Sequence, residues 1–420
     1  MASLKNTPHE PSIRKLLSSD PSYKSRMGIL NASITNAACR LEKGTADELF
    51  GDRLTLTQSQ IEKYVSCHFS YYCRYVLKLR DAKRASFDYS NIGTFIHKVL
   101  ELFLKETGKD TIDADRDIDK IRSIIRREIE EQSHLFIPKS KESEGRILHL
   151  LLRFYRLASL VAVNLCREQK YSRFMSRLYE AEFGKNSKLG LAPPELLLED
   201  GTTVSFSGKV DRVDTYRQGG RMYIRVVDYK TGAKSFSIDD IKEGYSLQLL
   251  LYLFAICDTK SEYFRRLIGC EDGDVLTPAG ALYISMAIPR LKREAGDSDA
   301  DTLEAASGEI KRSGILLNDP ETLHAMSKKL DPNILAGVRV NAKDGSLKGN
   351  ALVDEEGLAL LKEELGKTVC RIAEEIKSGN ANAYPSKRGG VLACAYCEMK
   401  PFCRVDQMKA SEKKEKENET

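Results

Sequence analysis

The sequence predicts a fold of the α/β class, because segments with helical periodicity and segments with strand character both recur along the chain. Three observations support this prediction. Helix-type patterns occupy most of residues 54–178, alternating segments rich in β-branched residues follow between 202 and 232, and an apolar helix at 245–257 precedes a further strand at 280–288.

The size and composition suit a soluble globular protein with a large core. The chain has 420 residues, 41% hydrophobic and 30% charged, which predicts two domains or one large domain with insertions. A net charge of +5, from 66 basic and 61 acidic residues, permits a nucleic-acid partner without requiring one. We find no apolar run that looks long enough to cross a bilayer, and the start, MASLKNTPHEPSIRK, lacks the apolar core of a signal peptide. We therefore expect a cytoplasmic protein.

The first half of the chain is predicted to be mainly helical. Residues 54–80 begin with Thr57 or Ser59 as a cap before a helix. Residues 90–106 form a second helix with an apolar stripe on one face: Ile96, Val99, Leu100, Phe103 and Leu104. Amphipathic helices are expected to follow over 117–133 and 144–178.

A β-hairpin is predicted next. Residues 202–217 and 221–232 alternate in character, and Gln218-Gly219-Gly220 supplies a short turn between them. The polar stretch 290–312 is interpreted as a flexible excursion, and 355–378 as an amphipathic helix.

One phosphate-loop-like triplet can be excluded. Gly366-Lys367-Thr368 resembles the end of such a loop, but Leu361 stands where the first glycine should be. The triplet also lies inside a helical pattern with no strand before it, so no ATPase motif is predicted.

Charged residues cluster at the end of the predicted hairpin. Asp228 and Lys230 share one strand face because side chains alternate, and three apolar residues precede them on it: Met222, Ile224 and Val226. Asp211 on the neighbouring strand is close enough for the two carboxylates to converge, and Gly208 permits a close backbone approach there.

Two acids and a lysine at adjoining strand ends suit phosphodiester hydrolysis assisted by Mg²⁺ or Mn²⁺, which prefer oxygen ligands. Such a metal lowers the pKa of the attacking water, and a lysine stabilises charge in the transition state. The alternative is an exposed cross-strand salt bridge, which contributes at most about 1 kcal/mol. On the hairpin alone, the two interpretations are equally supported.

Residues outside the hairpin favour the functional interpretation. His97 lies on the apolar side of the 90–106 helix, with Glu101 one turn later. Glu182 in YEAEF precedes the hairpin. Gln248 and Tyr252 lie four residues apart, and therefore on one face of the helix at 245–257.

Taken together, five segments resemble the RecB-type branch of the PD-(D/E)XK nuclease superfamily. In order between residues 93 and 254 they are GTFIHKVLE, EAEF, GKVDRVD, VVDYKTG and SLQLLLYLF. The resemblance implies a restriction-endonuclease-like core, in which a central mixed sheet is flanked by helices, with helical insertions.

The resemblance also implies roles for individual residues. His97, Asp211 and Asp228 would bind Mg²⁺ or Mn²⁺, and the backbone carbonyl of Tyr229 would complete the metal shell. Asp211 and Asp228 also count among the catalytic residues, together with three others: Lys230 as the catalytic lysine, and Gln248 and Tyr252 as supports of the site and the substrate.

The ten cysteines are not expected to form disulfides in a reducing compartment. Three of them, Cys394, Cys397 and Cys403, form a C-x2-C-x5-C run, with Cys67 as a candidate fourth ligand and Cys73 as its competitor. By thiolate count alone, a zinc ion and a [4Fe–4S] cluster are both suitable. The remaining cysteines are predicted to be small buried hydrophobes: Cys39, Cys166, Cys257, Cys270 and Cys370, with Cys73 if it is not a ligand.

One cysteine before the nuclease motifs and three after them resembles the order in iron–sulfur nucleases. This resemblance implies a [4Fe–4S] cluster held by Cys67, Cys394, Cys397 and Cys403. The cluster would act as a structural staple between the two ends of the domain.

Among the iron–sulfur nucleases, the AddB family of helicase–nuclease proteins is the most similar. The implied nuclease domain covers 48–408, residues 1–47 would be a remnant of an upstream helicase-like region, and 409–420 would be a disordered charged tail. The implied function is a Mg²⁺-dependent exonuclease for single-stranded DNA ends, working with an AddA-like subunit in double-strand break repair. The alternatives are a free-standing iron–sulfur exonuclease of the CRISPR-associated type and a non-catalytic DNA-binding scaffold.

Overall fold

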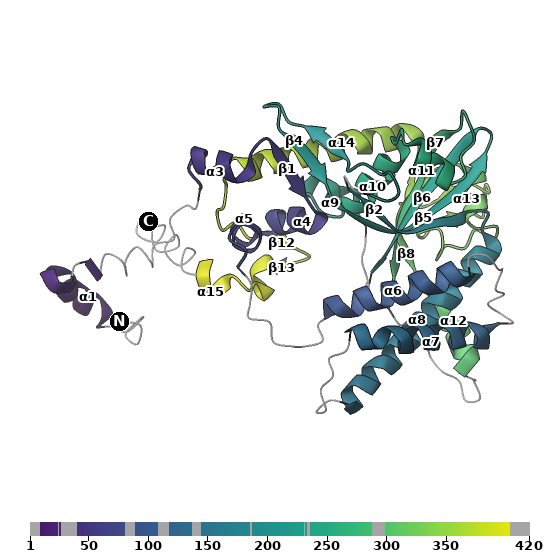
Figure 1. Cartoon of the computed structure of the whole chain (residues 1–420), viewed down its shortest axis with the longest axis horizontal. Coiled ribbons are helices and arrows are strands. Elements are labelled where there is room, and N and C mark those ends of the chain that lie inside the picture. Colours follow the sequence, from purple (N-terminus) through teal and green to yellow (C-terminus); the bar gives the residue numbers. More distant parts are fainter. Residues whose placement is uncertain are drawn as a thin grey trace. The chain divides into compact units, whose positions relative to one another are not determined.

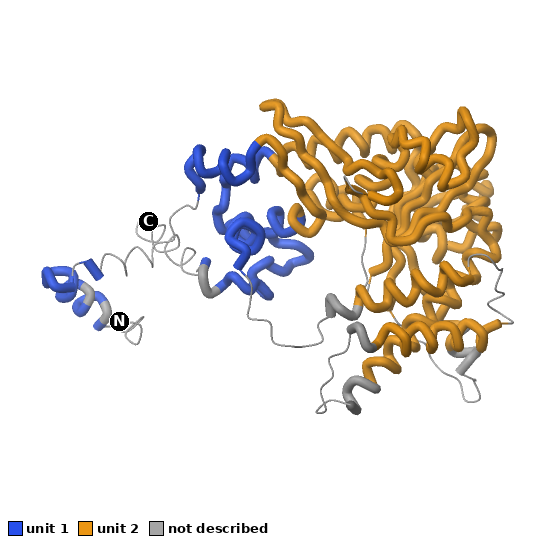
Figure 2. The backbone as a smooth tube through the Cα atoms, viewed as in Figure 1, with its two compact units in different colours: residues 1–51, 62–80, 374–420 blue, residues 52–61, 81–373 orange. Residues whose placement is uncertain are grey.

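The structure, a computed structural model, comprises two compact units (Figure 2). Unit 1 contains residues 1–51, 62–80 and 374–420, and unit 2 contains 52–61 and 81–373. The structure describes these residues: 9–23, 25–26, 40–79, 89–107, 117–136, 144–184, 187–230, 232, 236–287 and 299–403. The predicted tail 409–420 and much of 1–47 therefore lie outside the described residues.

A six-stranded mixed sheet forms the centre of unit 2 (Figure 1). Its strand order is β11-β8-β7-β6-β5-β2, with parallel pairs β6–β7 and β8–β11 and antiparallel pairs elsewhere. The strands are β2 Met175–Phe183, β5 Gly208–Gln218, β6 Arg221–Lys230, β7 Val275–Ser285, β8 Arg312–Leu317 and β11 Leu352–Val353. The α/β class and the mixed sheet flanked by helices are confirmed.

The predicted hairpin is formed by β5 and β6. Gln218 pairs with Arg221 across a two-residue turn, in which Gly219 and Gly220 have φ angles of 60° and 73°. Both angles are positive, as the favoured two-residue hairpin turn requires, and glycine adopts them without strain.

Four helices gather on one side of this sheet (Figure 1): α6 Tyr89–Thr107, α7 Ile118–Phe136, α8 Glu144–Tyr171 and α12 Asp299–Gly308. Their apolar side chains pack with Val227 and Tyr229 of β6 and with Ile284 of β7. The predicted stripe on α6 faces this core, because all of its members are at most 1% exposed.

Part of α8, His149–Tyr171, is long and apolar enough to cross a membrane by length and composition. The expectation that no run passes this test is therefore wrong. More than half of that stretch is buried in the structure, where α8 packs against α6, α7 and α12. This packing explains its apolar character as that of a core helix.

The remaining helices of unit 2 surround the sheet. The apolar α10, Gln248–Cys257, packs against β6 and β7. The others are α9 Ile238–Glu243, α11 Glu262–Leu267, α13 Pro320–Met326 and α14 Glu355–Lys377, whose last turn belongs to unit 1. Gly366-Lys367-Thr368 lies within α14, as predicted.

The expected strand 202–217 is divided between two sheets. β4, Thr203–Phe206, pairs with β1, Arg53–Leu56, and with β3, Glu195–Leu197, whereas β5 starts at Gly208. The change of sheet occurs at Ser207, whose N–H still donates to the Leu56 carbonyl at 3.1 Å. Alternation along the sequence does not reveal which partner a strand has.

Two other boundaries differ from prediction. The helix expected over 144–178 ends at Tyr171, because Arg173 N–H donates to the Ala325 carbonyl and β2 begins at Met175. The stretch 290–312 contains α12 at its end rather than only an excursion, and Ala306 and Ile310 of this stretch are buried. Residues 288–298 lie outside the described part of the chain.

Unit 1 brings together segments that are distant in sequence. Cys67, in extended conformation, divides the helix predicted over 54–80. Phe69 N–H donates to the Asn382 carbonyl at 3.1 Å, and Ser386 N–H donates to the Ser66 carbonyl at 2.9 Å. The elements here are α1 Glu10–Ser19, α3 Lys43–Phe50, α4 Gln58–Ser66 (from residue 62), α5 His68–Tyr71, the π-helix η2 Tyr72–Val76, β12 Lys387–Arg388, β13 Val391–Leu392, the 3₁₀-helix η4 Ala393–Tyr396 and α15 Lys400–Cys403. A short ribbon in unit 2 completes the fold: β9 Arg339–Val340 and β10 Leu347–Lys348.

Candidate active site

The two predicted acids lie where β5 and β6 separate. The pairing of these strands ends at Arg212 with Val227, so the next positions on each strand are Asp211 and Asp228. Beyond this point Tyr229 N–H donates to Asp211 Oδ2 at 2.7 Å instead of to a β5 carbonyl. Because N–H and C=O of one residue in an extended strand point to the same side, the Tyr229 carbonyl faces the Asp211 side as well.

His97 reaches the same place from α6. Its Nδ1 lies 3.3 Å from Asp211 Oδ1, and its ring meets the Tyr229 ring edge-on at 5.9 Å. Burial acts to lower the pKa of His97, but the hydrogen bond and charge of Asp211, with the charges of Asp228 and Glu180, outweigh it and raise the pKa. The histidine is therefore surrounded by negative charge, as a metal ligand in an acidic site would be.

Asp228 and Lys230 form a close ion pair, with Nζ 2.5 Å from Oδ2. The Asp228 side chain is 5% exposed and that of Lys230 is 30% exposed. Burial and the nearby Asp211 raise the pKa of Asp228 to about 6, although Lys230 and His97 oppose this. Lys230 Nζ also lies 5.5 Å from the centre of the Tyr283 ring.

Glu180 on β2 completes a group that the sequence prediction did not single out. One ligand atom each from His97, Glu180 and Asp211 lies within 4.8 Å of the other two. Asp228 is not a member of this group, because its carboxylate is directed to Lys230. A nitrogen and two carboxylate oxygens at this spacing fit a divalent cation such as Mg²⁺ or Mn²⁺.

The backbone at Glu180 is unusual for a strand. Its φ is +53°, a left-handed value that costs a non-glycine residue roughly 1–2 kcal/mol, and its carboxylate lies 2.5 Å from Lys209 Nζ. Glu182, which the sequence favoured, lies outside the three-residue group and is exposed. The signal available in the sequence was the pair of acids in YEAEF; the local twist that selects the first of them is not visible there.

Gln248 and Tyr252 bind the β5 backbone beside the site. Gln248 Nε2 donates to the Lys209 carbonyl at 3.3 Å, and Tyr252 Oη donates to the Ser207 carbonyl at 3.5 Å. A Cβ on Gly208 would lie 1.6 Å from the Tyr252 hydroxyl. The expectation that Gly208 permits a close approach is therefore confirmed, and the group that approaches is this tyrosine.

Glu101, one turn after His97, is occupied differently. It forms ion pairs with Lys98, at 2.9 Å, and with Lys105. Burial opposes the change, but these two lysines lower the pKa of Glu101. The structure thus gives it two cationic partners on its own helix.

The four cysteines named as cluster ligands line one small pocket in unit 1. Cys67 and Cys403 are buried, and Cys394 and Cys397 are half-buried. Burial raises the pKa of the Cys67 thiol, and Cys394 and Cys397 raise it further, against backbone hydrogen bonds that lower it. The competitor Cys73 is buried elsewhere and does not line this pocket.

The fold and this constellation of residues agree with a comparison to protein-family models. Residues 55–404 match the model of the PD-(D/E)XK nuclease superfamily, and the chain belongs to that superfamily. Acids and a lysine at the ends of adjoining strands, with a histidine from a preceding helix, are therefore found in a nuclease fold.

Curated relatives are similar along most of the chain. Each is named as the AddB-type subunit of an ATP-dependent helicase/deoxyribonuclease. The protein of Clostridium acetobutylicum is 30% identical over 90% of this chain and 32% of its own length, that of Clostridioides difficile is 31% identical over 90% and 32%, and that of Clostridium novyi is 29% identical over 96% and 35%. The chain thus spans about a third of the length of these relatives.

Proposed function

We propose that unit 2 is a metal-dependent deoxyribonuclease. The observation that carries the proposal is the convergence of His97, Glu180 and Asp211 within 4.8 Å, beside the buried Asp228–Lys230 pair. A scaffold protein has no need of a buried acid whose pKa is raised to about 6 next to a lysine. Membership of a nuclease superfamily supports the same conclusion.

Each residue has a role that follows from its contacts. His97, Glu180, Asp211 and the Tyr229 carbonyl would hold Mg²⁺ or Mn²⁺, with Asp228 as a further oxygen ligand at the edge of the site. When bound, the metal supplies Lewis acidity toward the phosphate and a more acidic water.

Lys230 supplies a mobile positive charge. Its partly exposed ammonium is held by Asp228 on one side, and its exposed side can contact a scissile phosphate or orient water, which stabilises negative charge in the transition state. Gln248 and Tyr252 fix the β5 backbone that carries Asp211, and thereby keep the ligands in place.

For the substrate we propose single-stranded DNA ends within a helicase–nuclease complex that includes an AddA-like protein. The support is that several relatives, similar over 85–96% of this chain, are named as a subunit of an ATP-dependent helicase/deoxyribonuclease. This chain alone shows a nuclease site, so the helicase activity would come from elsewhere.

For unit 1 we propose a structural [4Fe–4S] cluster on Cys67, Cys394, Cys397 and Cys403. Four thiolates around one zinc at about 2.3 Å would place the sulfur atoms roughly 4 Å apart. The four cysteines line one pocket, yet among the described residues no three of their sulfur atoms lie within 4.8 Å of one another. This wider spacing favours a cluster, in which each thiolate binds a different iron.

A single comparison tests the nuclease assignment. The full chain is purified without oxygen and assayed with Mg²⁺ on single-stranded DNA, alongside the Asp228→Ala variant. We expect cleavage by the wild type and a loss of at least a hundredfold in the variant. Equal activity in both proteins would overturn the assignment.

A further inference from the structure

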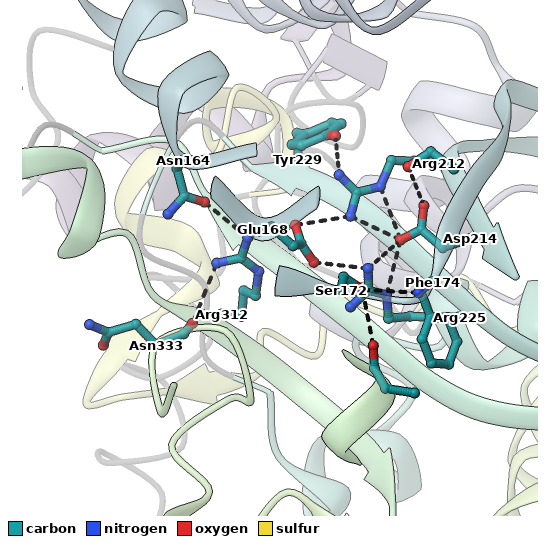
Figure 3. Close-up of polar contacts among 12 residues, drawn as sticks. Asn164, Glu168, Ser172, Phe174, Arg212, Asp214, Arg225, Tyr229, Arg312 and Asn333 are labelled. Carbon is teal, nitrogen blue, oxygen red and sulfur yellow. Dashed lines mark hydrogen bonds and ion pairs between the residues drawn. The ribbon is translucent and has the colours of Figure 1, made fainter. Parts of the chain in front are cut away.

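Five charged side chains form a network in the interior of unit 2 (Figure 3). They come from four elements of the fold: Glu168 of α8, Arg212 and Asp214 of β5, Arg225 of β6 and Arg312 of β8. Each side chain is at most 2% exposed. The network lies on the sheet face that carries Tyr229, because Arg225 and Tyr229 have the same parity on β6.

The two carboxylates are shared among the three guanidinium groups. Asp214 Oδ2 accepts from Arg212 Nη2 at 2.9 Å and from Arg225 Nη2 at 2.7 Å. Glu168 Oε2 accepts from Arg212 Nη2 at 3.3 Å and from Arg312 Nη2 at 2.8 Å. Burial would raise the pKa of Glu168, but the three arginines outweigh it and hold that pKa well below its usual range.

Stability does not explain why this network is present. Removing charges from water costs several kcal/mol per ion, and well-packed apolar residues in place of a buried ion network are often as stable or more stable. The network also has three cations for two anions, so its charges do not balance internally. A role in orienting another group accounts for both features.

That group is Tyr229. On the network side, Arg212 Nη1 donates to the Tyr229 hydroxyl at 3.1 Å. On the site side, Tyr229 N–H donates to Asp211 Oδ2, and its ring contacts the ring of His97. One residue therefore connects the buried arginine to two of the candidate metal ligands.

We propose that the network is a positioning device for the metal site, in which Arg212 holds Tyr229 and Tyr229 holds Asp211 and His97. With Oδ2 of Asp211 held by the Tyr229 amide, Oδ1 is directed to His97 and to the cation. The inference rests on the proposed metal-dependent function. Arg212 and Tyr229 are positioning residues, since neither side chain needs to touch the substrate.

Tyr229→Phe tests this, because it removes only the hydroxyl that Arg212 binds. The matched control is Tyr216→Phe, which removes a buried hydroxyl at the far end of the same hairpin, where it contacts Gln218. Mn²⁺ affinity is measured on each full chain by electron paramagnetic resonance, together with melting temperature, kcat and the KM for DNA.

We expect Tyr229→Phe to weaken Mn²⁺ binding by about tenfold, as is usual when a group supporting a metal ligand is lost. kcat should fall at limiting Mn²⁺ while the KM for DNA stays unchanged. Tyr216→Phe should leave Mn²⁺ affinity at the wild-type value, whatever its effect on melting temperature.

A second variant covers the case in which Tyr229→Phe does not fold. Arg212→Lys keeps the buried charge but cannot bridge Tyr229, Asp214 and Glu168 at once, and it should show the same tenfold loss of Mn²⁺ affinity. Wild type that binds Mn²⁺ and a folded variant with unchanged affinity would overturn the inference alone. Wild type that binds no Mn²⁺ would overturn the proposed function as well.

Discussion

Lys230 Nζ lies 2.5 Å from Asp228 Oδ2 at the end of β6, in a pair of which the acid is buried and the base is partly exposed. The acid is thus removed from water while the lysine can still reach it. The following predictions use this asymmetry and its neighbours.

Asp228 is expected to reduce stability when it is charged and no metal is bound. Because its pKa is raised to about 6 in the folded protein from an ordinary 3.8, the free energy of unfolding falls as pH rises through that interval. The interval corresponds to roughly 3 kcal/mol. Asp228→Asn should therefore raise the melting temperature at pH 8 in a chelating buffer, and should not do so at pH 4.

The matched control for this change is Asp258→Asn. Asp258 also pairs with a lysine, Lys362, at 2.6 Å, but its side chain is 58% exposed, and it should leave the melting temperature unchanged at both pH values. An Asp228→Asn protein no more stable than wild type at pH 8 would contradict the stated cause of the pKa shift.

Metal affinity should depend on pH. A cation displaces protons from its ligands, and the pKa of His97 is raised while that of Asp228 is about 6. Mn²⁺ affinity measured by calorimetry should therefore increase from pH 5.5 to pH 8, with one to two protons released. His97→Ala should bind more weakly and release fewer protons. An affinity that is constant over this range would count against both residues as neighbours of the metal.

Glu180 and Glu182 offer a paired test on one strand. Glu180 belongs to the three-residue group and Glu182 is exposed. Glu180→Gln should weaken Mn²⁺ binding at least tenfold, because it removes a charged oxygen ligand, whereas Glu182→Gln should have no effect. The reverse result would assign the ligand to the residue that the sequence favoured.

The cysteine pocket can be tested in the same way. Cys397→Ala should lose the iron and the visible absorbance of the anaerobically purified protein, because a thiolate ligand is removed. Cys73→Ala, which changes a buried cysteine outside the pocket, should keep both. Zinc in place of iron in the wild type, measured by metal analysis, would refute the cluster while keeping the ligands.

Gly208 should not tolerate a side chain. An added Cβ would lie 1.6 Å from the Tyr252 hydroxyl, so Gly208→Ala must displace Tyr252 or the β5 backbone next to Asp211. We expect a loss of about 1–3 kcal/mol in the free energy of unfolding and a parallel loss of activity. Gly184→Ala is the control, since nothing lies within 4 Å of its Cβ. Wild-type stability in Gly208→Ala would show that the tyrosine moves freely.

The sequence was most informative where short-range chemistry decides the structure. The hairpin followed from Gly219-Gly220, and the buried face of α6 from its apolar stripe. Long-range pairing was not accessible: the partner of β4 is β1, which lies about 150 residues earlier. The left-handed backbone of Glu180 is imposed by its surroundings, and no residue type in YEAEF announces it.

The buried network shows the same limit from the other direction. Arg212 and Asp214 are ordinary charged letters in GKVDRVD, which composition places on the surface. Their burial depends on Glu168 of α8 and Arg312 of β8, which stand 44 and 100 residues away from Arg212 along the chain. Only the assembled sheet brings these charges together.

The hydrogen bond from Phe69 N–H to the Asn382 carbonyl has a consequence for biosynthesis. A ribosome adding about 5–20 residues per second needs roughly 15–60 seconds to proceed from the first of these positions to the second. Residues 62–80 wait without their partners during that time, and by its end all of the described strands of the six-stranded sheet have been translated. Any group that all four cysteines hold can be completed only once residue 403 has left the ribosome, so its insertion is a late step that follows the folding of the nuclease sheet.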